Sequence, residues 1–205
     1  MSKSSQLSGE RVQNFSLAPA ADGPTSSLNG RSGDAQHIDK MIKELQPIAD
    51  QLAASRTQLF HAIEGLSDEL LRVPFPGREW SIKDTLAHLA ANEALMTELA
   101  EGIARGKSTH LPKDFDNDRF NAESVAARRD RSVRQVLEEL VRSRQRLFKF
   151  LGDVKSDQLL RRGTHPLQGE LTLREFLVVM YAHGVTHTRE IEEQVRRLNA
   201  KEMWK

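Results

Sequence analysis

The sequence contains no cysteine among its 205 residues. Disulfides, cysteine-based zinc sites and a cysteine nucleophile are therefore excluded, and any bound metal has to be held by histidine, aspartate or glutamate. The lack of cysteine also fits a cytoplasmic location, where thiols stay reduced. A run of about 18 apolar residues is missing as well, so the sequence predicts no membrane-spanning helix.

Neither sign of charge is in excess. The chain has 30 basic and 29 acidic residues, a formal net charge of +1, and only 5% aromatic residues. This balance gives no reason to expect a nucleic acid or an anionic membrane as a partner. A small-molecule substrate is the expectation that remains, and the length suggests one domain with an extension.

The extension is predicted at the N-terminus. Residues 1–35 are rich in Ser, Gly, Ala, Pro and Asn and show little apolar periodicity. We interpret them as a disordered tail, because such a composition cannot bury enough apolar surface to fold. Residues 36–205 are interpreted as one domain.

Four long segments of this domain keep apolar residues at helical spacing. They span about residues 39–64, 80–103, 132–151 and 172–200. Two of them open with capping-box spacing, namely Ser81 with Asp84 and Ser132 with Gln135. No strand-like alternation is found. The fold class predicted is therefore all-α, an up-down four-helix bundle with short extra helical turns at about 67–71, 121–130 and 156–160.

Two histidines lie on the apolar stripe of the last helix. Steps of three or four residues lead from Met180 to His183, His187 and Ile191. A buried imidazole without partners costs about 1–3 kcal/mol. Two imidazoles one turn apart, about 6 Å along the axis, can share one partner, and a metal ion is the economical choice.

A third histidine, His88, lies beside the apolar stripe of the second long helix. Taken alone, it reads as a core histidine bonded to a carbonyl. Facing the pair on the last helix, it becomes a candidate third ligand. Three neutral imidazoles suit zinc, nickel or iron(II), and they leave a coordination position open. The remaining histidines are expected to be solvated surface residues, namely His37, His61, His110 and His165.

Two carboxylates are candidates for supporting roles. Glu93 follows His88 by five residues, and Glu190 follows His187 by three. Either could orient a ligand ring or act as an acid or base. The alternatives are an ion-paired or rim residue for Glu93 and a solvated carboxylate for Glu190. The third long helix carries a basic set that is expected to face solvent, consisting of Arg142, Arg144, Arg146 and Lys149.

These motifs resemble those of the DinB-like superfamily. The stretch Trp80-Ser81-Ile82-Lys83-Asp84-Thr85-Leu86-Ala87-His88-Leu89 with Glu93 is similar to its second-helix motif. His183-x-x-x-His187 followed by Arg189-Glu190-Ile191 is similar to its last-helix motif, and Phe120-Asn121-Ala122-Glu123 to its middle section. The resemblance implies a four-helix bundle with a three-histidine metal centre, often in a homodimer. It also implies kinship with transferases and isomerases that use low-molecular-weight thiols.

Two functions from different classes follow from this resemblance. The first is a metal-dependent S-transferase or isomerase, in which His88, His183 and His187 hold a divalent ion that lowers the pKa of a small thiol co-substrate for attack on an electrophile. The second is a non-catalytic bundle that binds a small molecule under stress or sequesters a toxin. A bundle without metal, whose histidines are only hydrogen-bonded, is the plainest alternative.

Overall fold

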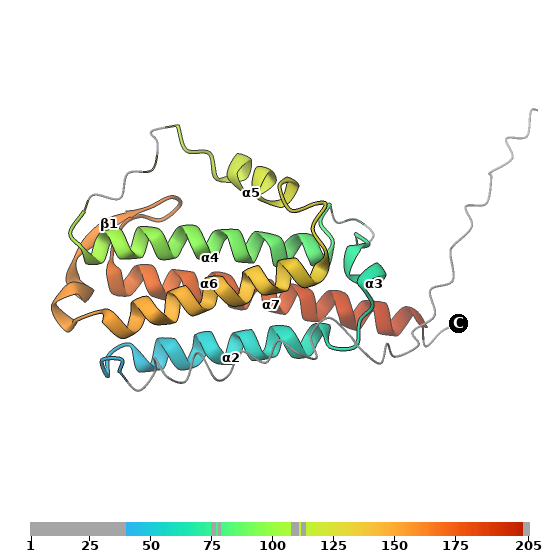
Figure 1. Cartoon of the computed structure of the whole chain (residues 1–205), viewed down its shortest axis with the longest axis horizontal. Coiled ribbons are helices and arrows are strands. Elements are labelled where there is room, and N and C mark those ends of the chain that lie inside the picture. Colours follow the sequence, from blue (N-terminus) through green and yellow to red (C-terminus); the bar gives the residue numbers. More distant parts are fainter. Residues whose placement is uncertain (1–39, 75–76, 78, 108–110, 112–113, 203–205) are drawn as a thin grey trace, which may run out of the picture.

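A computed structural model describes residues 40–202, apart from 75–76, 78, 108–110 and 112–113. The tail predicted over residues 1–35 and the histidines His37 and His110 lie outside the described residues. The described part is built around four long helices (Figure 1), which are α2 (Gln46–Ile63), α4 (Ile82–Ala104), α6 (Val133–Asp153) and α7 (Leu173–Glu202). The predicted four-helix bundle is thus confirmed.

The helices begin where the sequence supplies capping groups. Ser81 accepts a hydrogen bond from the Asp84 backbone, and Asp84 accepts one from the Ser81 backbone. Ser132 and Gln135 form the same reciprocal box at α6. Pro47 lies at the first turn of α2, where its missing N–H costs nothing, so the helix starts there and is not kinked. The expected start near residue 39 was therefore too early.

The order of helix directions follows from one long connection. Helices α2 and α4 run antiparallel, and so do α6 and α7, but α4 and α6 run parallel (Figure 1). The segment between α4 and α6 returns along the outside of the bundle and contains the short helix α5 (Asn117–Ala126). As a result α4 packs against both α6 and α7, while α2 packs against α7.

The remaining elements are short. Helix α3 (Asp68–Arg72) follows α2, and the 3-10 helix η1 (Ser156–Leu160) follows α6. The expectation of no strands was wrong, because β1 (Arg162–His165) and β2 (Gly169–Thr172) form an antiparallel hairpin before α7. Four-residue strands are too short for a period of two to stand out. The turn instead depends on Gly169, whose φ of 73° favours glycine.

The core consists of two apolar clusters. One gathers residues near the hairpin end of the bundle, including Leu45, Leu52, Leu147 and Phe176, and the other gathers Leu59, Leu86, Leu137 and Ile191 near the opposite end. Every long helix contributes apolar residues to both clusters, and between the two clusters its buried residues are polar or charged. We call the residues at this change the polar layer; they are Ser55, Arg56, His88, Glu93, Ser143, Arg144, His183, His187 and Thr188.

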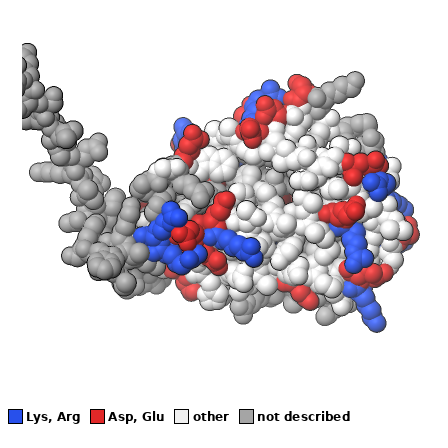
Figure 2. All heavy atoms as spheres, turned by 180° about the vertical axis from the view of Figure 1, so that it is seen from behind, with Lys and Arg blue, Asp and Glu red and all other residues white. Residues whose placement is uncertain are grey.

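Charged residues on the surface do not follow the arrangement of the buried polar layer. On the face seen in Figure 2, charged side chains of both signs gather at the left and right ends and in one group at the upper edge, around a largely uncharged central area. Among the described residues, no helix is both long and apolar enough to cross a membrane. The interior is the more informative region, because buried polar groups interrupt the apolar core there.

Candidate metal centre

The three predicted histidine ligands meet in the polar layer. Helix α4 supplies His88, and the antiparallel helix α7 supplies His183 and His187 from successive turns. One nitrogen from each ring can be chosen so that all three lie within 4.8 Å of one another. The Nε2 atoms of His88 and His183 are 3.1 Å apart. Two ligands of a tetrahedral zinc ion at about 2.0–2.1 Å would lie roughly 3.3 Å apart, so the spacing fits a shared ion.

The environment keeps two of these rings neutral. Burial, followed by the proximity of His187 and His183, lowers the pKa of His88 to about 3. Burial and the neighbouring His187 lower the pKa of His183 to about 4. Neutral imidazoles are the form that binds a metal. The rings also contact one another edge to face, with centroids 4.6–5.1 Å apart. The donor set therefore suits a divalent ion of intermediate softness.

The ring of His187 has an orienting partner. Its Nδ1 atom lies 2.9 Å from Oε2 of Glu190, and a carboxylate can only accept, so Nδ1 carries the proton. The Nε2 atom of His187 then has its lone pair free to bind a metal ion. This carboxylate–histidine pair is the usual outer support of a metal site. The structure thus places the predicted residue Glu190 beside the centre in an orienting position.

The ring of His88 reveals a residue that sequence reasoning did not assign. Among the described residues, Nδ1 of His88 and Oδ1 of Asn121 are the buried side-chain atoms that lack a hydrogen-bond partner of normal geometry. Nδ1–H of His88 can donate and Oδ1 of Asn121 can accept, and hydrogen bonding to Asn121 raises the pKa of His88, which partly offsets the lowering by burial. Asn121 lies on α5, so the crossing helix brings an amide to the far side of the His88 ring.

The other predicted carboxylate, Glu93, occupies a different position. Its oxygens accept hydrogen bonds from Arg56 at 3.1 and 3.2 Å, from Arg144 at 2.7 and 3.0 Å, and from Ser143 at 2.8 Å. Although burial acts to raise the pKa of Glu93, the charges of Arg144 and Arg56 outweigh it and lower the pKa to about 2. Glu93 is therefore a fixed anion, and such a weak base is poorly suited to acid–base catalysis near neutral pH.

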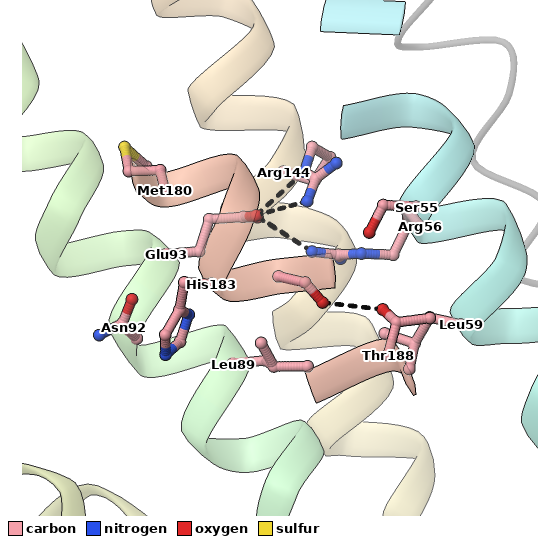
Figure 3. Close-up of a pocket in the computed structure, with 11 residues that line it drawn as sticks. Ser55, Arg56, Leu59, Leu89, Asn92, Glu93, Arg144, Met180, His183 and Thr188 are labelled. Carbon is pink, nitrogen blue, oxygen red and sulfur yellow. Dashed lines mark hydrogen bonds and ion pairs between the residues drawn. The ribbon is translucent and has the colours of Figure 1, made fainter. Parts of the chain in front are cut away.

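A small cavity connects this ionic cluster with the centre. It is lined by Arg56, Glu93 and Arg144 on one side and by His183 on the other, and its further walls come from Ser55, Leu59, Leu89, Asn92, Met180, Gly184 and Thr188 (Figure 3). In Figure 3 the Glu93 carboxylate points toward both guanidinium groups. The pocket thus places the ionic cluster next to His183, the member of the triad that lines it.

Comparison with known proteins fits this geometry. The profile of the DinB superfamily matches residues 51–191. The chain belongs to the DinB superfamily. It is 25% identical over 155 residues to YuaE of Bacillus subtilis (strain 168), described as an uncharacterized protein, covering 70% of this chain and 96% of YuaE.

A solved structure shares the fold of this DinB-superfamily chain. YfiT from Bacillus subtilis, described as a probable metal-dependent hydrolase with an unusual four-helix bundle topology, aligns with a TM-score of 0.61. The alignment covers 89% of this chain and 93% of YfiT at 18% sequence identity. At that identity the likeness shows the fold alone.

Two sequence expectations around the site of this DinB-superfamily chain were wrong. Arg144 was expected on a solvated face but is only 4% exposed, and it also donates to the Leu52 carbonyl. His165 was expected at the surface but is 7% exposed, and its Nδ1 accepts the backbone N–H groups of Leu167 and Gln168. Both side chains are held by partners distant in sequence or by a turn that periodicity does not detect.

A spacing argument could have found the arginines. Arg144 lies four residues after Leu140, and Arg56 lies four residues after Leu52, so both continue apolar stripes. A charged residue on a buried stripe needs an opposite charge, and Glu93 interrupts the facing stripe of α4. His61, by contrast, is exposed as expected and pairs with Glu64 at 3.2 Å.

Proposed function

We propose that this chain is a metal-dependent enzyme acting on a small molecule at the three-histidine centre. The observation that carries the proposal is the convergence of His88, His183 and His187 from two antiparallel helices onto one point. Three protein ligands leave at least one coordination position open, as in catalytic rather than structural sites.

The residues around the centre would have different roles, which are metal binding, orientation of a ligand ring and charge pairing. The three imidazoles would hold the ion, and Glu190 would fix the His187 ring with Nε2 facing inward. When bound, a divalent ion supplies a nucleophile by lowering the pKa of a coordinated water or thiol. Glu93 would stay ionised and hold Arg56 and Arg144, so the chain's own acid–base candidate at the centre is Glu190, which is partly exposed.

The nucleophile defines two forms of this proposal. The form favoured by the sequence is an S-transferase or isomerase that uses a low-molecular-weight thiol, since the chain has no cysteine and the thiol must come from outside. The second form is a hydrolase that uses water, supported by the description of YfiT, which shares the fold. The electrophile differs between them: the thiol form adds sulfur to its substrate, whereas the hydrolase cleaves an ester or amide bond.

Metal analysis is the first test. Protein purified without a His tag should contain close to one equivalent of zinc, nickel or iron, and His183→Ala should lose it while remaining folded. His61→Ala, which removes an exposed histidine of α2, is the matched control and should keep the metal. A stoichiometric absence of metal in the unmutated protein, after reconstitution with each ion, would overturn the proposal.

An activity panel then separates the two forms. Metal-loaded protein is incubated with bacillithiol, mycothiol or glutathione and a generic electrophile, and in parallel with activated esters and amides. Metal-dependent consumption of the thiol supports the transferase, and metal-dependent cleavage without thiol supports the hydrolase. Recovery of a bound, unchanged small molecule together with no turnover would instead favour the non-catalytic binding bundle.

A further inference from the structure

The outer face of α7 lacks the charged residues that a helix normally presents where it borders solvent. Residues 176–188 contain no Lys, Arg, Asp or Glu. Within this stretch Val178 and Ala182 are exposed, and Val179 and Val185 are half-buried. Their spacing of three or four residues places them on one stripe of the helix. Contiguous apolar surface of this kind marks an interaction site, whereas scattered apolar residues do not.

The stripe is a surface separate from the three-histidine centre. With 3.6 residues per turn, His183 and His187 are turned roughly 100° and 140° around α7 from Ala182, and His183 meets a ring of α4. In Figure 1, α7 lies behind α6, so Figure 2, seen from behind, views the outer side of α7, and its central area is largely uncharged. Contacts made by the stripe therefore do not involve the ligand nitrogens.

Opposite charges flank the two ends of the stripe. Glu175 lies seven residues before Ala182 and Arg189 seven residues after it, so each is two turns, about 10 Å, from the middle of the stripe. Both side chains are exposed. Oε2 of Glu175 accepts the N–H and hydroxyl of Thr172, and Arg189 makes no hydrogen bond or ion pair with the residues that the structure describes. The two charges are about 21 Å apart along α7, so they cannot pair within one chain.

A second copy of the chain would complement this face. If two α7 helices pack antiparallel about a two-fold axis at Ala182, each residue lies opposite the one equally far on the other side of Ala182 in the partner. Glu175 then lies opposite the partner's Arg189 at both ends, and Val178 lies beside the partner's Val185. The small side chain of Ala182 at the axis lets two helices approach to about 8–10 Å.

The parallel orientation lacks this complementarity. It would place Glu175 beside the partner's Glu175 and Arg189 beside the partner's Arg189, so both ends would repel. The charge pattern thus favours one orientation as well as one kind of partner. We infer that the outer face of α7 is a self-association surface on which a second copy of the chain binds antiparallel. The inference does not rest on the proposed function, because none of the three candidate ligands belongs to the stripe.

The mass of the full-length protein in solution is the first test. Sedimentation equilibrium is measured from micromolar to millimolar concentration, in chelator and again with added zinc. A monomer–dimer equilibrium is expected in both conditions. A monomer at every concentration overturns the inference, and so does a dimer seen only with zinc, since the ion would then link the two copies. Metal content is measured separately, so either proposal can fail while the other holds.

Ala182→Arg should abolish the dimer. At the two-fold axis the substituted side chain meets its own copy, so two like charges and two long side chains oppose each other. Ala182 is exposed and arginine is a good helix former, so the fold should be retained. Arg142→Glu on the exposed face of α6 is the control for a change in surface charge and should leave the dimer unchanged. A dimer that persists in folded Ala182→Arg uses a different interface and overturns the inference.

Charge reversal tests the register of the two helices. Glu175→Arg and Arg189→Glu each place like charges opposite each other at both ends, so each should raise the dissociation constant about tenfold. An equimolar mixture of the two variants should recover the original affinity, because every reversed charge then faces its opposite. Glu175→Arg also removes the acceptor for the Thr172 N–H, but mixing would not repair a folding defect. Lack of recovery in the mixture overturns the inference, and if Glu175→Arg does not fold, Ala182→Arg and its control decide alone.

Discussion

The histidine triad and the Arg56–Glu93–Arg144 cluster lie in the same polar layer, but they satisfy their polar atoms in different ways. In the ionic cluster, each guanidinium contacts both Glu93 and a backbone carbonyl of a neighbouring helix, Leu140 for Arg56 and Leu52 for Arg144. In the triad, His88 and His183 face each other through Nε2, and Nδ1 of His88 has no partner of normal geometry. The guanidinium and carboxylate groups of the ionic cluster thus have protein partners, whereas the histidine triad leaves a ring nitrogen of His88 without one.

This difference separates architecture from function within one layer. The ionic cluster joins α2, α4 and α6 and explains why a bundle can tolerate charges in its interior. The triad joins α4 and α7 through the contact between Nε2 of His88 and Nε2 of His183 and through edge-to-face contacts between the rings. We therefore expect the cluster to govern the stability of the metal-free protein and the triad to add stability only when an ion is bound. Four predictions test this contrast.

The largest effect is expected from Glu93→Ala. Removing the carboxylate leaves two buried guanidinium groups facing each other, which typically costs about 3–5 kcal/mol. The free energy of unfolding, measured by urea titration of metal-free protein, should fall by this amount. Glu98→Ala on the exposed face of α4 is the control and should change it by less than about 0.5 kcal/mol. A similar small change for Glu93→Ala would show that the cluster does not hold the helices together.

The next effect is the loss of metal-dependent stability in His88→Leu. With chelator present, this variant should be at least as stable as the unmutated protein, because it removes a buried nitrogen without a partner. With metal at about 100 times its dissociation constant, the unmutated protein should gain about 2.7 kcal/mol, and the variant should gain nothing. The measurement is the same urea titration with and without added zinc. A strong loss of stability in chelator would mean that the ring itself is a structural element.

The histidines themselves were accessible to sequence reasoning, and most of their surroundings were not. His183 and His187 lie on one helical stripe, so their position followed from the period of the helix. Glu190 followed in the same way, since it is one turn from His187. Asn121 and Arg56 come from other elements, and their contacts depend on how α5 crosses the bundle and how α2 packs near α6. Periodicity describes one helix at a time, so it cannot supply a partner that tertiary packing brings from another.

The same limit explains the result for the fold. Caps at Ser81 and Ser132 gave helix starts correctly, because capping is decided within four residues. The parallel course of α4 and α6 depends on the path of the connection between them. That path cannot be derived from a short stretch of sequence in the way that a helix cap can. The hairpin depends on a turn at Gly169 and on burial of His165 against Phe176, with ring centroids 5.1 Å apart. These features are set by contacts rather than by local sequence preference.

The pH dependence of stability should separate the two groups further. In the metal-free protein the pKa values of His88 and His183 are about 3 and about 4, below the ordinary value of 6.5. Between these values and 6.5 the unfolded chain binds more protons, so stability falls as pH decreases, by up to about 1.4 kcal/mol per pH unit for each histidine. Glu93, with a pKa of about 2 against 4.5, loses its contribution only below about pH 4.5. Urea titrations from pH 7 to 4 should show the first window flattened in His88→Leu and retained in His61→Ala.

The smallest effect is expected from Asn121, whose amide oxygen is the acceptor available to Nδ1 of His88. When Nε2 of His88 is a ligand, the ring proton resides on Nδ1, and an acceptor behind it fixes the ring and raises its basicity. Asn121→Leu should therefore weaken metal binding about tenfold, with little change in metal-free stability, because both orphaned atoms are already without a normal bond. Asn121→Asp should restore or exceed the original affinity, because a carboxylate is the stronger acceptor. Competition with a chromophoric chelator measures both, and equal losses in the two variants would show that Asn121 only fills space between α5 and α4.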